Sequence, residues 1–246
     1  MKRNVKITLQ YDGGRYKGWQ KLGDNPNTIQ QKLEDILEKK VGRNIPVIGS
    51  GRTDAGVHAL GQVANFHLVT DETASQIQDY INAYLPGDIA VTEAIFVPEA
   101  FHSRYHVKEK IYSYRIHNDA IPFVFDRKYC HHVPEPLRLE PMREAMAMLE
   151  GTHDFLGFSS LKKTKKSTTR TLHSLTLEKE GPKLRFIFQG DGFLLHSIRI
   201  MMGTLLEVGF GTMKPKEIEE IFIKKVRREA GFTVPPQGLF LEEVRY

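Results

Sequence analysis

Cysteine is almost absent from this sequence, which has one, Cys130, among 246 residues. A single thiol excludes an intramolecular disulfide, a cysteine zinc cluster and a Cys-x-x-Cys redox pair. Long apolar runs are also missing, because the most apolar stretch, 192–211, contains His196, Arg199 and Glu207. We therefore expect no membrane-spanning helix. The first residues lead directly into a strand-like pattern without an apolar signal segment, and we expect a cytoplasmic protein.

The motifs of several common enzyme classes are missing as well. Gly49-Ser50-Gly51 leads to Asp54 where a Walker or dinucleotide loop would need glycine. Ile48 stands where the nucleophile elbow of a serine hydrolase would have its first glycine. His131 and His132 have no third ligand at a standard zinc spacing, so we expect strand-end packing and no metal site there.

What is present is the composition of a folded, mildly basic protein. Hydrophobic residues make up 40% and charged residues 26% of the chain, which excludes wholesale disorder. Lys and Arg number 35 against 30 Asp and Glu, giving a formal charge of +5. This excess favours an anionic partner. The length suits one large domain or two compact halves of about 120 residues each.

Hydrophobic periodicity predicts the same order of elements in each half of the chain. Thr28 and Gln31 are spaced as a capping box at the start of the first helix, and Gly42 marks its end. The first half is predicted to contain strands over 5–11, 45–50, 62–69 and 89–97 and helices over 29–41 and 74–84. The second is predicted to contain strands over 110–116, 175–179, 183–189 and 239–246 and helices over 142–149, 193–208 and 216–225.

Each half thus resembles a ferredoxin-like split βαβ unit. We predict an α+β protein with two ferredoxin-like halves, residues 1–104 and 105–246, whose antiparallel sheets join around a central basic cleft. Such a surface suits RNA, although the same fold also serves structural and small-molecule roles.

The densest unusual feature is the segment 49–63, in which four glycines surround Arg52 and Asp54. Glycine allows the backbone to approach a ligand closely. A nearby arginine favours the ionised carboxylate, which is the form that covalent catalysis by an aspartate requires. The alternative is an ordinary aspartate in a glycine turn, hydrogen-bonded to its own backbone.

The string GRTDAGVHALGQVANF, residues 51–66, closely resembles the signature of the tRNA pseudouridine synthase A (TruA) family. Further similarity to that family follows in order along nearly the whole chain. The similar blocks are Tyr11-Asp12-Gly13, Gly18-Trp19-Gln20, Phe101-His102-Ser103-Arg104, 110–114, Arg170-Thr171, Phe193-Leu194, 199–203, Gly209, Ala230-Gly231 and Gly238-Leu239.

The resemblance implies an enzyme that isomerises uridine to pseudouridine in the anticodon stem-loop of tRNA, at positions 38 to 40. It also implies catalysis without cofactor or metal, and a homodimer that binds tRNA. A stacked base cannot react in this way, so the target uridine must be flipped out at a cost of a few kcal/mol.

The same resemblance assigns roles to four residues. Asp54 matches the catalytic aspartate, the nucleophile at either C1′ or C6, and Arg52 would help to open the base stack or hold a phosphate. Arg199 matches the partner of the aspartate, although without the family it would be read as an arginine snorkelling from a core helix. Tyr112 would stack on the uracil and help to remove the C5 proton, whereas Tyr114 is expected to be a packing residue.

A basic run covers residues 161–170 and contains no acidic residue. Its cations would neutralise RNA phosphates, or the run is a solvated loop, as lysine runs usually are. The residues predicted to bind RNA are Lys162, Lys163, Lys165, Lys166 and Arg170.

The chain departs from the family pattern in three places: Asp191 replaces an expected asparagine, and the segments 196–198 and 231–235 also differ. Because of these departures, a paralogue with altered tRNA position preference is an alternative to the enzyme described above. A non-catalytic RNA-binding protein is a further alternative. A nucleoside hydrolase would need a second acid or base, and the glycine-rich segment offers only Asp54.

Overall fold

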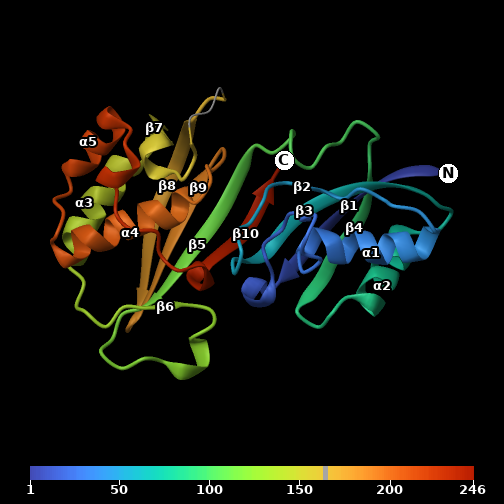
Figure 1. Ribbon diagram of the computed structural model, residues 1–246, viewed down its shortest axis with the longest axis horizontal. Helices are drawn as coiled ribbons and strands as arrows, with labels where there is room; N and C mark the ends of the chain where they lie inside the picture. Colours follow the sequence, from blue (N-terminus) through green and yellow to red (C-terminus); the bar gives the residue numbers. More distant parts are fainter. Residues whose placement is uncertain (163–165) are drawn as a thin grey trace. The chain divides into compact units, whose positions relative to one another are not determined.

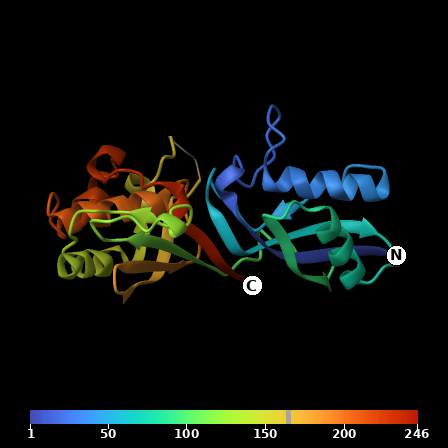
Figure 2. The same cartoon turned by 90° about the horizontal axis from the view of Figure 1, so that it is seen from below.

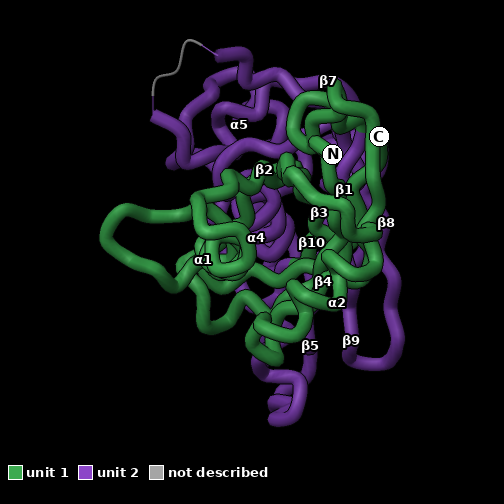
Figure 3. Tube along the Cα trace, turned by 90° about the vertical axis from the view of Figure 1, so that its right-hand side faces the viewer, with its two compact units in different colours: residues 1–108, 240–246 green, residues 109–239 purple. Residues whose placement is uncertain are grey.

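The computed structural model describes residues 1–162 and 166–246. It confirms the predicted α+β class, with mostly antiparallel strands and helices in each half. The chain packs into two compact units, residues 1–108 with 240–246, and residues 109–239 (Figure 3). This grouping describes packing alone, so the predicted domain limits at 104 and 105 stay a prediction.

The sheet of unit 1 has the strand order β4-β1-β3-β10, with the short β2 paired to β3 (Figure 1). β1 pairs antiparallel with β3 and β4, whereas β10 pairs parallel with β3. The strands are β1 (Lys2–Tyr11), β2 (Ile48–Gly49), β3 (His58–Val69), β4 (Ile89–Val97) and β10 (Leu239–Arg245). The order β-α-β-β-α-β predicted for the first half is therefore observed.

Two helices complete this unit, α1 (Ile29–Val41) and α2 (Ala74–Tyr84), which contact each other. Thr28 accepts a hydrogen bond from the Gln31 amide, as predicted. The reciprocal half of that capping box is wrong, because the Gln31 side chain donates to Asp35 instead. A complete capping box stands at α2, where Thr73 and Gln76 exchange both bonds.

The core of unit 1 follows from the alternation in β1. Val5, Ile7 and Leu9 have no exposed surface, and Leu33 and Leu37 of α1 are equally buried. Removing such apolar surface from water stabilises the fold by roughly 25 cal/mol per Å². By contrast, residues 20–24, in the connection between β1 and α1, are exposed, and this loop projects from the unit (Figure 2).

Unit 2 has a sheet of order β5-β9-β8-β7, with β6 beside β5. Neighbours along that order are antiparallel. Its strands are β5 (Glu109–His117), β6 (His131–His132), β7 (Gly151–Asp154), β8 (Thr169–Glu180) and β9 (Lys183–Gly190). Its helices α3 (Leu139–Leu149), α4 (Ser197–Phe210) and α5 (Glu217–Lys224) make contacts between α3 and each of the other two.

Two features of the second half differ from the sequence prediction. α4 begins at Ser197 and not at Phe193, because His196 takes a left-handed conformation with φ of 61° and stops the helix from extending backwards. The strand predicted at the end of this half, β10, belongs to unit 1 from Phe240 on, and Phe240 lies opposite His58. Over the two described ranges, no helix is both long and apolar enough to cross a membrane.

Candidate active site

Asp54 lies in unit 1, in the loop that leads from β2 to β3. Its side chain is half-buried, and Arg52 beside it is exposed. Between them Thr53 is buried, with 6% of its surface exposed. The loop therefore turns Thr53 inward, while the arginine on one side faces solvent and the carboxylate on the other is partly accessible.

A buried hydrogen-bond network holds this loop. The Tyr11 hydroxyl lies 2.8 Å from Thr53 Oγ1, and the Gln62 side-chain amide donates to the Tyr11 hydroxyl and to the Gly51 carbonyl. Ser50 Oγ in turn donates to Gln62 Oε1 at 2.7 Å. The network joins β1, β3 and the loop, so the residue before Asp54 is fixed through its side chain.

Backbone contacts hold the same loop from its other side. The Trp19 amide donates to the Thr53 carbonyl at 3.1 Å, and the Gly56 amide donates to the Tyr16 carbonyl. Gly18 has a φ of 96°, and a Cβ atom there would lie 2.5 Å from the Thr53 carbonyl oxygen. Only glycine fits this approach, so the close contact between the segments around residues 18 and 53 depends on Gly18.

Burial sets the protonation of the network. It raises the pKa of Tyr11 to about 12, against the smaller lowering effect of its hydrogen bonds with Thr53 and Gln62. The phenol is therefore neutral at physiological pH, and it serves as a hydrogen-bonding anchor. Tyr11 was not predicted from the sequence as a site residue, because an aromatic side chain in a strand is usually interpreted as part of the hydrophobic core.

His58 begins β3 and is almost fully buried. Its ring stacks on Phe240 of β10 with centroids 4.7 Å apart, and its Nδ1 lies 3.1 Å from both the Gly13 amide nitrogen and Asp12 Oδ1. These contacts give His58 a structural role at the end of the Asp54 loop.

Tyr112 lies in unit 2, on β5, with 7% of its surface exposed. Its ring meets that of Phe193 edge to face, with centroids 5.3 Å apart and an angle of 81° between the planes. Tyr114 on the same strand is fully buried and donates its hydroxyl proton to the Pro235 carbonyl at 2.8 Å. The prediction that Tyr114 is a packing residue is confirmed.

Arg199 lies in the first turn of α4 and is half-buried. Its Nε donates to the Val234 carbonyl at 2.8 Å, and the Val234 amide donates back to the Arg199 carbonyl. The chain around Val234 can approach α4 because Gly203 has no side chain: a Cβ there would lie 1.8 Å from the Phe232 carbonyl oxygen. The arginine is thus oriented by a fixed backbone, which a merely snorkelling side chain would not need.

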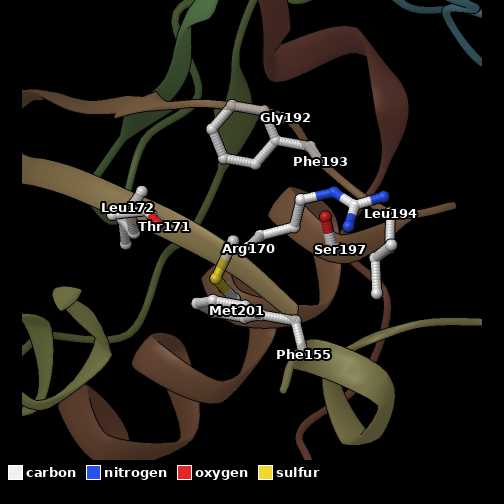
Figure 4. Close-up of a pocket in the computed structure, with 9 residues that line it drawn as sticks. All are labelled: Phe155, Arg170, Thr171, Leu172, Gly192, Phe193, Leu194, Ser197 and Met201. Atoms are coloured by element: carbon white, nitrogen blue, oxygen red, sulfur yellow. The ribbon is translucent and has the colours of Figure 1, made fainter. Parts of the chain in front are cut away.

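A small pocket lies next to these residues in unit 2 (Figure 4). The Arg170 side chain reaches across it toward Ser197 and Leu194. Ser197 is buried, and its Oγ has no hydrogen-bond partner in the described part of the chain. The pocket is lined by Phe155, Arg170, Thr171, Leu172, Gly192, Phe193, Leu194, Ser197 and Met201.

The basic run is partly described. Lys162 and Lys166 are exposed, and Arg170 is half-buried with Nη1 donating to the carbonyls of Ser167 and Thr169. Lys163 and Lys165 lie outside the described residues. The predicted site residues therefore divide between the units, with Arg52 and Asp54 in unit 1 and all the others that the structure describes in unit 2.

Comparison with known proteins finds relatives over most of the segments that carry these residues. A family model described as "tRNA pseudouridine synthase" matches residues 7–106 and 145–246. The chain belongs to this family. A tRNA pseudouridine synthase A from Bacillus sp. (strain KSM-64) is 48% identical over 99% of both chains. One from Clostridium tetani, named tRNA pseudouridine synthase A 1, is 45% identical over 99% of this chain and all of the other.

Membership of the tRNA pseudouridine synthase family makes this chain a relative of uridine isomerases that act in tRNA processing. The matched segments include the Asp54 loop and α4 with Arg199, whereas residues 107–144, with Tyr112, fall between them. In the described ranges, no group of three or more His, Cys, Asp or Glu side chains could hold a metal ion.

Proposed function

We propose that this protein isomerises uridine to pseudouridine in the anticodon stem-loop of tRNA, at positions 38 to 40, with Asp54 as the nucleophile. The observation that carries the proposal is the Asp54 loop. It holds a half-buried carboxylate next to Thr53, whose hydroxyl is hydrogen-bonded to Tyr11, which in turn accepts from Gln62, in a chain of the pseudouridine synthase family. Catalysis is efficient when the reacting group is already held in its working position.

The chemistry needs no co-reactant, because substrate and product are isomers. The glycosidic bond between N1 and C1′ breaks and a bond between C5 and C1′ forms. The proton on C5 is lost and N1 gains one, so atoms and charge balance. The Asp54 carboxylate adds to either C1′ or C6 and leaves again before the product is released. The proposal therefore includes neither cofactor nor metal.

Three side chains are proposed to assist at the same uridine. Arg52 is exposed, and it helps to open the base stack or holds a phosphate while the base is flipped. Tyr112 stacks on the uracil, and its hydroxyl helps to remove the C5 proton. Arg199, whose Nε is oriented by the Val234 carbonyl, stabilises the ionised carboxylate of Asp54.

The surroundings of the reaction follow from charge and family. Lys162, Lys163, Lys165, Lys166 and Arg170 are proposed to bind tRNA phosphates, in keeping with the formal charge of +5. We further propose a homodimer in the cytoplasm, as the family resemblance implies.

The test replaces Asp54 by alanine and by asparagine and measures pseudouridine in purified tRNA. Both variants should lose at least about a thousandfold in rate, as expected when a covalent nucleophile is removed. Binding of tRNA should persist, because the exposed cations remain. Tyr80→Phe, a conservative change on α2, is a matched control that should modify tRNA at the wild-type rate.

Each alternative predicts a different result in the same assay. Wild-type activity in the Asp54 variants would remove this residue from the mechanism. Binding of tRNA without conversion by the wild-type protein would identify a non-catalytic RNA-binding protein. Release of free uracil would identify a hydrolase, and pseudouridine at positions other than 38 to 40 would identify a paralogue with another position preference.

A further inference from the structure

A turn in unit 1 that the reaction does not use presents a stacked pair of aromatic rings to solvent. Tyr105, 77% exposed, is among the most exposed large side chains described. Its ring stacks on His102 with centroids 4.2 Å apart and an angle of 28° between the planes. One face of the phenol is thus covered by an imidazole, while the exposed fraction leaves the other face open to a ligand.

The His102 ring of the pair is held by hydrogen bonds to the backbone. His102 Nδ1 accepts hydrogen bonds from the amides of Arg104 and Tyr105, at 3.1 and 3.3 Å. The His102 amide donates to His106 Nδ1, and the His106 amide donates to the His102 carbonyl. The imidazole therefore has a set orientation, and Tyr105 rests on it without needing a ligand to order it.

The turn is anchored to the core of unit 1. Ser103 has no exposed surface, its amide donates to Asn65 Oδ1 at 2.9 Å, and its carbonyl accepts from the Tyr246 hydroxyl at 2.7 Å. The Phe101 ring lies 5.0 Å from that of Tyr246. A platform built in this way loses little conformational entropy when a ligand stacks on it.

The charges around the platform suit a polyanion. Arg104 and Lys108 are exposed, and no acidic residue occurs from Phe101 to Lys108. The carboxylates that flank this stretch in the chain both have partners: Glu99 pairs with Lys2 and His67, and Glu109 lies 3.9 Å from His173. An open aromatic face with exposed positive charge nearby is how proteins hold an unpaired nucleotide, with the base stacked on the ring and the phosphate near the cation.

We propose that Tyr105, backed by His102, is a stacking platform for one unpaired base of the tRNA, with Arg104 at the adjoining phosphate. This rests on the proposed function, since it takes tRNA as the polyanion. Stacking is tolerant of sequence because every base has a π face. The platform therefore adds affinity for a loop or a flipped nucleotide, whatever its identity.

The test measures tRNA affinity at several salt concentrations. Tyr105→Ala should weaken binding about tenfold and leave the slope of log affinity against log salt unchanged, because no charge is lost. Tyr105→Phe and Tyr105→Trp should bind like the wild type, since they keep the ring. Arg104→Ala should reduce the slope by about one unit. Tyr84→Ala, another exposed tyrosine (49%) on α2, is the matched control and should change neither.

Two results would overturn the platform while leaving the proposed function standing: wild-type tRNA affinity in Tyr105→Ala, or equally weak binding by Tyr105→Ala and Tyr105→Phe. In either case the wild-type protein would still convert uridine. A wild-type protein that neither binds nor modifies tRNA would remove the proposed function and the platform together. Because Tyr105 is so exposed, all its variants should unfold at the wild-type temperature, and this separates lost stacking from lost folding.

Discussion

The Tyr11 hydroxyl is one of the groups that hold the loop that carries Asp54. Tyr11 lies 42 residues before Thr53 in the sequence and within 2.8 Å of it in the fold. An aspartate in a glycine-rich turn ordinarily makes only local hydrogen bonds, whereas here its neighbour Thr53 is also held by a side chain from β1. The position of the Asp54 carboxylate, the nucleophile that we propose, therefore depends on a residue 43 positions before it in the chain.

Tyr11→Phe tests this dependence. Removing the hydroxyl leaves Thr53 Oγ1 and the Gln62 amide without their shared partner, and unfolding should become easier by about 1–2 kcal/mol. The rate of uridine conversion should fall while tRNA affinity holds, because the loop is loosened but the binding surface is intact. Thermal unfolding and single-turnover kinetics measure the two effects. A wild-type turnover rate would show that the hydroxyl does not position the loop.

The same variant should also behave differently in alkali. The Tyr11 pKa is raised to about 12 by burial, so the fold favours the neutral phenol. Its contribution to stability is complete below the ordinary tyrosine value of about 10, and it is lost as pH rises from there toward 12. The stability difference between wild type and Tyr11→Phe should therefore shrink between about pH 10 and 12 in denaturant unfolding.

At the scale of elements, the orientation of Arg199 depends on how closely α4 and the segment 230–234 approach each other. The Gly231 amide donates to Thr204 Oγ1 at 2.9 Å, and the Arg199 Nε bond to Val234 follows from the same contact. Gly203 in α4 and Gly231 in the facing segment leave the space for it. An exposed helix would not need glycine at this position.

Gly203→Ala should separate the two elements. The new methyl group would overlap the Phe232 carbonyl, so the segment 230–234 must move. This movement should lower the free energy of unfolding by about 1–3 kcal/mol. It should also break the Arg199 hydrogen bond to Val234 and reduce activity. Gly209→Ala in the same helix is the control: its neighbours are the flexible ends of Met142 and Leu137. Equal stability and activity of the two variants would contradict the close-approach argument.

Most helices and strands could be predicted from the periodicity of hydrophobic residues, but their first and last residues were predicted less accurately. The alternation of Val5, Ile7 and Leu9 specifies β1, because it matches the two-residue repeat of a strand. The start of α4 could not be predicted, since Phe193, Leu194 and Leu195 are as apolar as the helix and only the backbone conformation of His196 marks its beginning. Nor could the network of Tyr11, Thr53 and Gln62, because contacts across 42 residues leave no periodic signal.

For the whole molecule, binding of tRNA should depend on salt through the exposed cations. Replacing Lys162 and Lys166 by alanine should reduce the slope of log affinity against log salt by about two units, if each neutralises one phosphate. Filter binding between 50 and 300 mM salt measures the slope. Lys214→Ala with Lys216→Ala, an equally exposed pair on another loop, should leave it nearly unchanged. An unchanged slope in the first pair would make the run a solvated connection.

The family could be recognised from the sequence because its motifs are short contiguous segments. The pairing of strands that are distant in the sequence could not be predicted. The string of residues 51–66 is contiguous and can be compared directly. That β10 lies beside β3 could not be read from its own pattern, because an apolar strand at the end of one half fits either sheet equally well.

The position of β10 has a consequence for biosynthesis. The unit that carries Asp54 is assembled from the first 108 residues and from seven that the ribosome delivers more than 130 residues later. Until those seven emerge, the start of β3, at His58 and Ala59, lacks its parallel neighbour, and His58 lacks the Phe240 ring that covers it. Such long-range closure is slow. A nascent chain interrupted before Phe240 should therefore present an unpaired strand edge, and a chain that is able to react with uridine should exist only after translation has passed this strand.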